Sequence, residues 1–118
     1  MEVQIFGWRN DANTRKALRF FSERRLKTHF VDLQERPASR GELVRFVQRF
    51  GADAVIDRGS KRLRALGLHT ALYGPERWLD ILAEEPRLLV TPLVRSGQRL
   101  SVGLDEDAWR AWLEAARP

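Results

Sequence analysis

The side chains that could do chemistry gather near the N-terminus, in residues 8–15. Asp11 carries a carboxylate, and carboxylates act as nucleophiles in some enzymes. Arg9 and Arg15 flank it, and a guanidinium can hold a carboxylate or phosphate through two hydrogen bonds. No evident general acid or metal-binding set stands nearby, however, and an Asp before a helix commonly accepts hydrogen bonds from the first turn. We expect Asp11 to be a helix cap and keep a functional carboxylate as the alternative.

Other kinds of chemistry are excluded by composition. The 118 residues contain no cysteine, so disulfides, Cys-bound zinc, iron–sulfur clusters and thiol reactions by this chain alone are ruled out. His29 and His69 are the two histidines, too few for a histidine-rich metal site, and we interpret both as structural. We therefore expect no metal and no cofactor.

Length and charge indicate one domain with an uneven charge along the chain. Residues 1–66 hold 15 basic and 8 acidic side chains, whereas residues 67–118 hold 6 and 8, which together give the net charge of +5. A basic half attracts an acidic protein surface, a small anion or a nucleic acid. Direct nucleic-acid binding is not expected, because the basic residues are spread over several elements without aromatic partners.

The ends and apolar runs of the chain predict its location. The apolar runs are too short for a membrane span, and the first ten residues lack the pattern of a signal peptide. We expect a cytoplasmic monomer that makes no membrane contact.

The elements that must position these residues follow from periodicity and caps. Alternation predicts a strand over residues 2–6, a loop over 7–10, a helix capped by Asp11 or Asn10 that runs to about Arg24, and a second strand over 28–33. On this first helix, Ala17, Leu18 and Phe21 share one stripe. Because a helix connects the two strands, we expect them to be parallel.

The middle of the chain is predicted to be helical. Ser39 and Glu42 form a capping box that opens a helix ended by Gly51. Short helices over 53–56 and 60–66 follow, and a further helix runs from Gly74 to Pro86, with Trp78, Leu79, Ile81 and Leu82 inward.

The last third predicts a short buried strand over 88–90, a break at Thr91 and Pro92, a strand from Leu93, a turn over 95–98, a strand over 99–102, and a helix capped by Asp105. The order β-α-β, helices, β-β-α describes a thioredoxin-like α/β fold. We therefore predict a single domain over residues 1–118, with a sheet of about four strands and a helical insertion over about 38–85.

Four segments in this order resemble the arsenate reductase (ArsC) and Spx family along nearly the whole chain. They are Ile5-Phe6 followed by Thr14-Arg15-Lys16-Ala17, then Arg58-Gly59-Ser60-Lys61 with Leu66-Gly67-Leu68, then Leu88-Leu89-Val90-Thr91-Pro92-Leu93-Val94, and finally Gly103-Leu104-Asp105-Glu106 leading into Trp109. The resemblance implies the thioredoxin-like fold and a cis peptide bond before Pro92.

The departures from the family pattern lie at its reactive positions. Asp11 stands where the family has its reactive Cys, Thr14 stands where Spx-type members complete CxxC, and Thr91 replaces an Arg before the proline. The arginines that would hold an arsenate or glutathionyl adduct have only loose equivalents in Arg58 and Arg99. The resemblance thus assigns as active-site positions, for binding rather than catalysis, Trp8, Arg9, Asn10, Asp11, Thr14, Arg15, Arg58, Thr91, Pro92 and Arg99.

Two of these positions leave their roles open. Trp8 lies beside the family's active site, where an aromatic side chain either fills the emptied cleft or presents a contact surface. Thr14 falls in the first turn of the helix, where it caps or packs.

In the family a thiolate is both the nucleophile and the source of electrons, and Asp11 can form no disulfide. Its charge also repels an oxyanion, by roughly 1–4 kcal/mol at about 4 Å. The resemblance therefore implies a non-catalytic protein that binds a partner, as Spx contacts RNA polymerase, or a small anion. The alternative is a glutathione-dependent, arsenate reductase-like protein that uses an external thiol from glutathione or a partner. A third interpretation is a scaffold whose cleft is filled.

Overall fold

The alternating residues at the N-terminus form strand β1 (Glu2–Gly7), which lies inside a four-stranded sheet. The computed structural model describes residues 1–117. They group into a first unit, made of residues 1–34 and the segment from residue 91 onward, and a second unit of residues 35–90. The single domain predicted over residues 1–118 stays a prediction.

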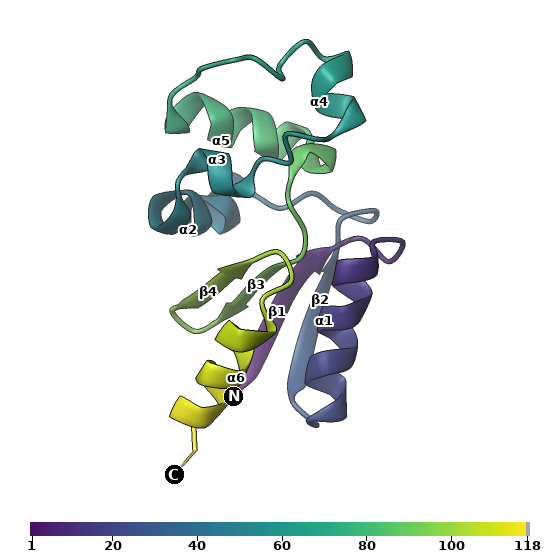
Figure 1. Ribbon diagram of the computed structural model, residues 1–118, viewed down its shortest axis with the longest axis vertical. Helices are drawn as coiled ribbons and strands as arrows, with labels where there is room; N and C mark the ends of the chain where they lie inside the picture. The colour runs from purple at the N-terminus through teal and green to yellow at the C-terminus, as the bar shows by residue number, and fades with distance from the viewer. Residues whose placement is uncertain (118) are drawn as a thin grey trace. The chain divides into compact units, whose positions relative to one another are not determined.

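The sheet belongs to the first unit and has the order β2-β1-β3-β4 (Figure 1). Strand β2 (Lys27–Asp32) runs parallel to β1, to which helix α1 (Ala12–Glu23) connects it. Strands β3 (Leu93–Ser96) and β4 (Arg99–Val102) form a hairpin, and β3 runs antiparallel to β1. This confirms the thioredoxin-like α/β fold and the parallel first pair.

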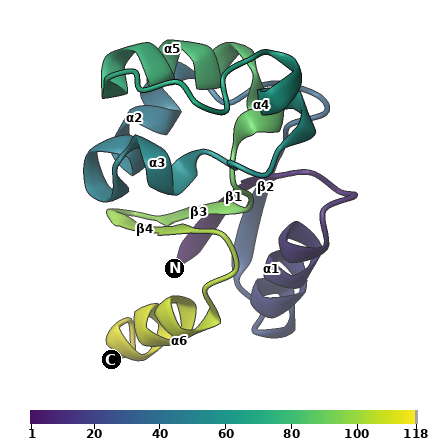
Figure 2. The same ribbon diagram turned by 45° about the horizontal axis from the view of Figure 1, so that its top comes forward.

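Helices α1 and α6 (Glu106–Ala115) pack on the same face of this sheet (Figure 2). Asp105 caps α6 as predicted, by accepting a hydrogen bond from the Ala108 N–H. The rings of Phe20, Phe21 and Trp109 pack against one another in edge-to-face and tilted arrangements, with centroids 5.0–5.3 Å apart. Phe20 joins the predicted stripe of α1, and Leu18 is only partly buried. The core of the first unit consists of Val3, Ile5, Ala17, Phe20, Phe21, Val94, Trp109 and Trp112.

The second unit is helical. It contains α2 (Arg40–Phe50), α3 (Ala52–Val55), α4 (Lys61–Ala65), α5 (Pro75–Glu84) and the 3₁₀ turn η1 (Pro86–Leu88). The capping box of Ser39 and Glu42 is present, and Gly51 ends α2 at a φ of 86° that favours glycine. Trp78, Leu79 and Leu82 are buried, whereas Ile81 is half-buried. No helix within residues 1–117 is long and apolar enough to cross a membrane.

The strand predicted over residues 88–90 is wrong. Pro86 instead starts the η1 turn, in which the Leu89 N–H donates to the Pro86 carbonyl. Leu89 then forms a single isolated bridge with Ile56. An apolar run of three residues is compatible with either structure, and the preceding proline favours the turn.

Ion pairs link the helices of the second unit. Arg40 of α2 contacts Glu76 and Asp80 of α5, and Arg62 of α4 forms two hydrogen bonds with Glu85. Arg36 likewise donates to both carboxylate oxygens of Glu42, at 2.9 and 3.0 Å. Several of this unit's positively charged side chains are therefore paired with carboxylates of the same unit.

The buried hydrogen bond between α6 and β4 yields a stability prediction. Trp109 Nε1 donates to Ser101 Oγ at 2.8 Å, and both residues are buried. We expect Ser101→Ala to lower the free energy of unfolding in urea by about 1–3 kcal/mol, because it leaves a buried donor without a partner. The control Ser22→Ala removes an exposed hydroxyl that donates to the Arg19 carbonyl, and its effect should stay below about 0.5 kcal/mol. Equal effects of the two variants would contradict this assignment.

The capping box yields a pH prediction for Glu42→Gln. Hydrogen bonds from Arg36 lower the pKa of Glu42 from 4.5 to about 2. Because the folded-state pKa is the lower one, the pair stabilises the fold above a pH of about 4.5 and loses this effect as the pH falls toward about 2. Over that range, the free energy of unfolding should fall by about 1 kcal/mol more in the wild type than in Glu42→Gln. Parallel losses, measured by urea titration, would show that the ion pair has no such role.

Candidate functional site

Asp11 caps the first turn of α1. Its backbone is extended, and its Oδ2 accepts a hydrogen bond from the Thr14 N–H at 3.1 Å. The Asp11 N–H donates to the Trp8 carbonyl at 3.0 Å, which closes the loop between β1 and α1. Of the two caps that the sequence allowed, Asp11 is therefore the one used, and Asn10 is exposed in the loop.

The same oxygen of Asp11 accepts two further hydrogen bonds, from hydroxyl groups. Thr14 Oγ1 donates to Asp11 Oδ2 at 2.7 Å, and Thr91 Oγ1 donates to it at 2.8 Å. Thr91 comes 80 residues later in the sequence. The two meet because β3 pairs antiparallel with β1, which brings the segment before β3 to the end of β1. The peptide bond between Thr91 and Pro92 is cis, as the resemblance implied.

Thr14 is fully buried and organises the loop around it. Its Oγ1 accepts from the Trp8 N–H at 3.4 Å while donating to Asp11. A Cβ on Gly7 would lie 2.3 Å from Thr14 Oγ1, so only glycine allows this close approach. Of the two roles that the sequence left open, Thr14 therefore packs, and its hydroxyl links the Trp8 backbone to the Asp11 side chain, which caps the helix.

The exposed fraction of Trp8 is only 8%, so most of its indole packs inside the protein rather than presenting a surface. A hollow of about 230 Å³ lies beside it and is also lined by Arg9, Asn10, Asp32 and Gln34. Arg9 Nε pairs with Asp32 Oδ2 at 3.3 Å, and its guanidinium lies 4.8 Å from the centroid of the Phe30 ring. Loop residues and the end of β2 thus form one side of the site.

The remaining arginines assigned from the sequence each have a partner of their own. Arg15 Nη1 donates to the Arg9 carbonyl at 2.9 Å. Arg58 belongs to the second unit, where it pairs with Asp53 and lies over the Trp78 ring. Arg99 stands at the end of the β3–β4 hairpin that is remote from Pro92, and its Nη1 donates to the Trp112 carbonyl at 3.5 Å. The structure does not bring Arg99 to Asp11.

The site therefore centres on a carboxylate that is tied to its own helix and to Thr91. A negative charge at this point is favoured by the N–H groups of the first turn of α1. Within residues 1–117, no group of three or more His, Asp or Glu side chains is arranged to hold a metal ion. The residues brought together here are suited to binding and positioning, and none of them supplies a redox-active atom.

The amino-acid sequence is similar to those of two transcriptional regulators. The global transcriptional regulator Spx 2 of Oceanobacillus iheyensis is 29% identical over 115 residues, which cover 96% of this chain and 84% of that protein. The global transcriptional regulator Spx of Streptococcus pyogenes serotype M1 is 30% identical over 95 residues, covering 75% and 71% of the two chains.

The fold is also found in solved structures. The arsenate reductase from Vibrio cholerae superposes with a TM-score of 0.82 at 20% identity, over 93% of this chain and 97% of that one. This likeness supports the fold assignment. The family model for the ArsC family matches residues 6–112, which is well over half of the sequence. This protein therefore belongs to the ArsC family.

Proposed function

We propose that this chain is a non-catalytic ArsC-family protein that acts by binding a protein partner. The observation that carries the proposal is the state of Asp11, whose Oδ2 accepts hydrogen bonds from Thr14 N, Thr14 Oγ1 and Thr91 Oγ1. By the resemblance, this is the position of the family's reactive thiol. A carboxylate forms no mixed disulfide and supplies no electron pair for a reduction.

The arginines of the first unit that were assigned to the site already have partners within the protein, which supports a protein partner over a small anion. Arg9 pairs with Asp32, Arg15 with the Arg9 carbonyl, and Arg99 with the Trp112 carbonyl. None of these three arginines is directed at Asp11, and the Asp11 carboxylate would itself repel an oxyanion. These described side chains therefore provide no cradle of positive charge for arsenate or phosphate around Asp11.

The loop of residues 8–11 is well suited to a contact surface. Its backbone is held by the Asp11 cap, by the Thr14 hydroxyl and by Arg15, while the side chains of Arg9, Asn10 and Arg15 are exposed. A loop fixed in advance loses less entropy when a partner binds. Because Trp8 is buried, its role in this proposal is to support the loop.

Two relatives are global transcriptional regulators, so the partner we propose first is RNA polymerase, which the resemblance to Spx implies. We further propose that the protein is a cytoplasmic monomer. The alternative function, reduction through an external thiol, requires glutathione or a partner to supply all of the sulfur chemistry.

A redox assay separates binding from the external-thiol alternative. We expect the wild type, mixed with arsenate, glutathione, glutaredoxin and NADPH, to oxidise no more NADPH than the same mixture without it. Asp11→Cys is the matched control, because it restores a thiol at the helix N-terminus, where the pKa of a thiol is lowered. After treatment with glutathione disulfide, this variant should carry a glutathione adduct in the mass spectrum and the wild type should not. Turnover by the wild type would refute the non-catalytic assignment.

A binding assay tests the partner and the loop. We expect the wild type to bind RNA polymerase purified from the same organism in biolayer interferometry. Arg15→Ala should weaken binding by about 1–2 kcal/mol, because it removes an exposed cation and the hydrogen bond that holds the Arg9 carbonyl. Arg19→Ala, one turn further along α1, removes the same charge and should leave affinity unchanged. No binding by the wild type would favour the interpretation as a scaffold. Equal losses of affinity in Arg15→Ala and Arg19→Ala would show that the contact does not centre on the loop.

A further inference from the structure

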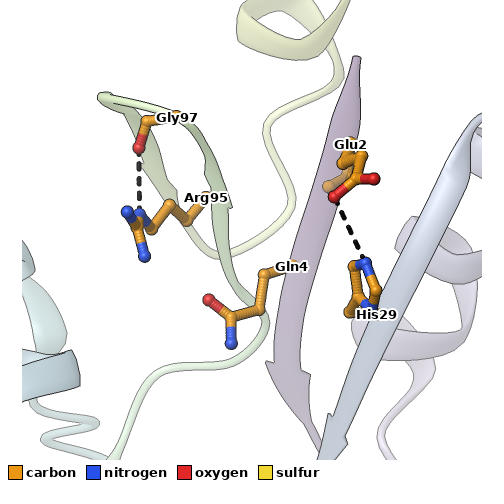
Figure 3. A pocket seen from close by; sticks show the side chains of 6 residues that line it. Glu2, Gln4, His29, Arg95 and Gly97 are labelled. Atoms are coloured by element: carbon orange, nitrogen blue, oxygen red, sulfur yellow. Dashed lines mark hydrogen bonds and ion pairs between the residues drawn. The ribbon is translucent and has the colours of Figure 1, made fainter.

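A hollow of about 360 Å³ opens on the first unit's sheet, and Glu2, Val3, Gln4, His29, Arg95 and Gly97 line it (Figure 3). Side chains alternate between the two faces of a strand. Because Val3 and Ile5 belong to the core with α1 and α6, Glu2 and Gln4 point to the opposite face. The hollow therefore lies on the face of the sheet that those two helices do not contact.

Three hydrogen-bonding side chains form a row across the floor of this hollow. Gln4 pairs in register with His29 on β2 and with Arg95 on β3, so the three share one face of the sheet. Figure 3 shows Gln4 between the other two side chains. With strands about 4.8 Å apart, an imidazole, an amide and a guanidinium extend over roughly 10 Å.

The donors at one end of this row are oriented and available. Arg95 Nε donates to the Gly97 carbonyl at 2.9 Å, which fixes the plane of the guanidinium. Within residues 1–117, neither terminal nitrogen of Arg95 nor the side-chain amide of Gln4 has a hydrogen-bond partner. Two free N–H groups of a fixed guanidinium match the two oxygens of a carboxylate.

The carboxylate already in the hollow is neutralised. Glu2 lies 3.3 Å from Lys27 Nζ and 3.4 Å from His29 Nε2. Hydrogen bonding from Lys27 holds the pKa of Glu2 below its ordinary value, so Glu2 stays charged and paired. Lys27 offsets Glu2, and the charge of Arg95 has no counterpart in the group. The hollow therefore has a net positive charge and favours an anion.

We propose that the row of His29, Gln4 and Arg95 binds an acidic segment of a partner protein through its carboxylates. The openness of the hollow argues for a peptide segment over a free small acid. The side chains of Lys27, His29 and Glu2 are 67%, 54% and 60% exposed. Small-molecule sites bury most of their ligand, and this surface does not. A longer chain gains affinity from the sheet around the hollow.

The spacing of the row fits such a segment. In an extended chain, side chains on one side recur about every 7 Å, so when one acidic side chain reaches Arg95, another at an alternate position reaches toward the exposed Lys27 beside His29. This site is separate from Asp11, because Glu2 begins β1 and Asp11 follows its end, about 20 Å away along the strand. This site involves neither Asp11 nor its loop and is independent of the proposed function.

Fluorescence anisotropy with a labelled peptide of alternating Glu and Ser tests this proposal, with a peptide of alternating Lys and Ser as the reference. We expect the full chain to bind the acidic peptide and not the basic one. Arg95→Ala should weaken binding about tenfold, which is the loss of one charge-assisted contact. Arg19→Ala, which removes the same charge from α1, should change it less than about twofold.

A second variant and a competitor complete the test. Gln4→Glu places a negative charge in the centre of the row and should abolish binding even if Arg95→Ala folds poorly. Succinate should fail to displace the labelled peptide at concentrations where the unlabelled peptide displaces it. Equal losses of affinity in Arg95→Ala and Arg19→Ala would show that the peptide responds only to the net charge of the protein, and would overturn the proposal. Displacement by succinate at peptide-like concentrations would overturn the peptide assignment.

Discussion

One carboxylate oxygen joins the start of α1 to the segment before β3. Asp11 Oδ2 accepts from Thr14 N, Thr14 Oγ1 and Thr91 Oγ1, all at 3.1 Å or less. The bonds to Thr14 are local and fix the first turn of the helix. The bond to Thr91 depends on the pairing of β1 with β3. By the resemblance, Asp11 stands at the position of the family's reactive sulfur, and here its carboxylate holds three donors. Each of these donors would be left without a partner if the carboxylate moved away to react.

One face of the first unit's sheet forms the apolar core, and one end of the other face carries the site that we propose for recognition. Val3, Ile5 and Val94 join the aromatic core with α1 and α6 on the first face. On the second face, the strand positions in between carry Gln4, His29 and Arg95, which are polar and at least partly exposed. Because the side-chain period of a strand is two, both sets are positioned by the same backbone register. A change of register by one residue would exchange them, so the apolar core also fixes the polar row.

The sequence predicted the features that depend on neighbouring residues. The capping box of Ser39, the caps at Asp11 and Asp105 and the parallel first strands are confirmed. The short apolar run over residues 88–90 was misassigned, because three residues cannot distinguish a strand from a turn. Arg99 was grouped with Asp11 because a sequence does not show which end of a hairpin faces a loop. His29 looked isolated in the sequence because its spatial neighbours Gln4 and Arg95 lie far away along the chain. The register of the three strands brings them together.

The charge is uneven along the sequence, but it is distributed almost evenly between the two units of the structure. The first unit contains 11 basic and 8 acidic residues, for a net charge of +3, and the second contains 10 and 8, for +2. The difference disappears because the acidic first turn of α6 returns to the unit that holds the basic α1. Net charge therefore singles out neither unit for an acidic partner. What matters is which cations lack an internal counterpart: Arg40 and Arg62 pair with carboxylates of their own unit, while the terminal nitrogens of Arg95 do not. In the site that we propose, a few donors without an internal partner, held in fixed positions, decide recognition, and a basic composition alone is a poor guide to them.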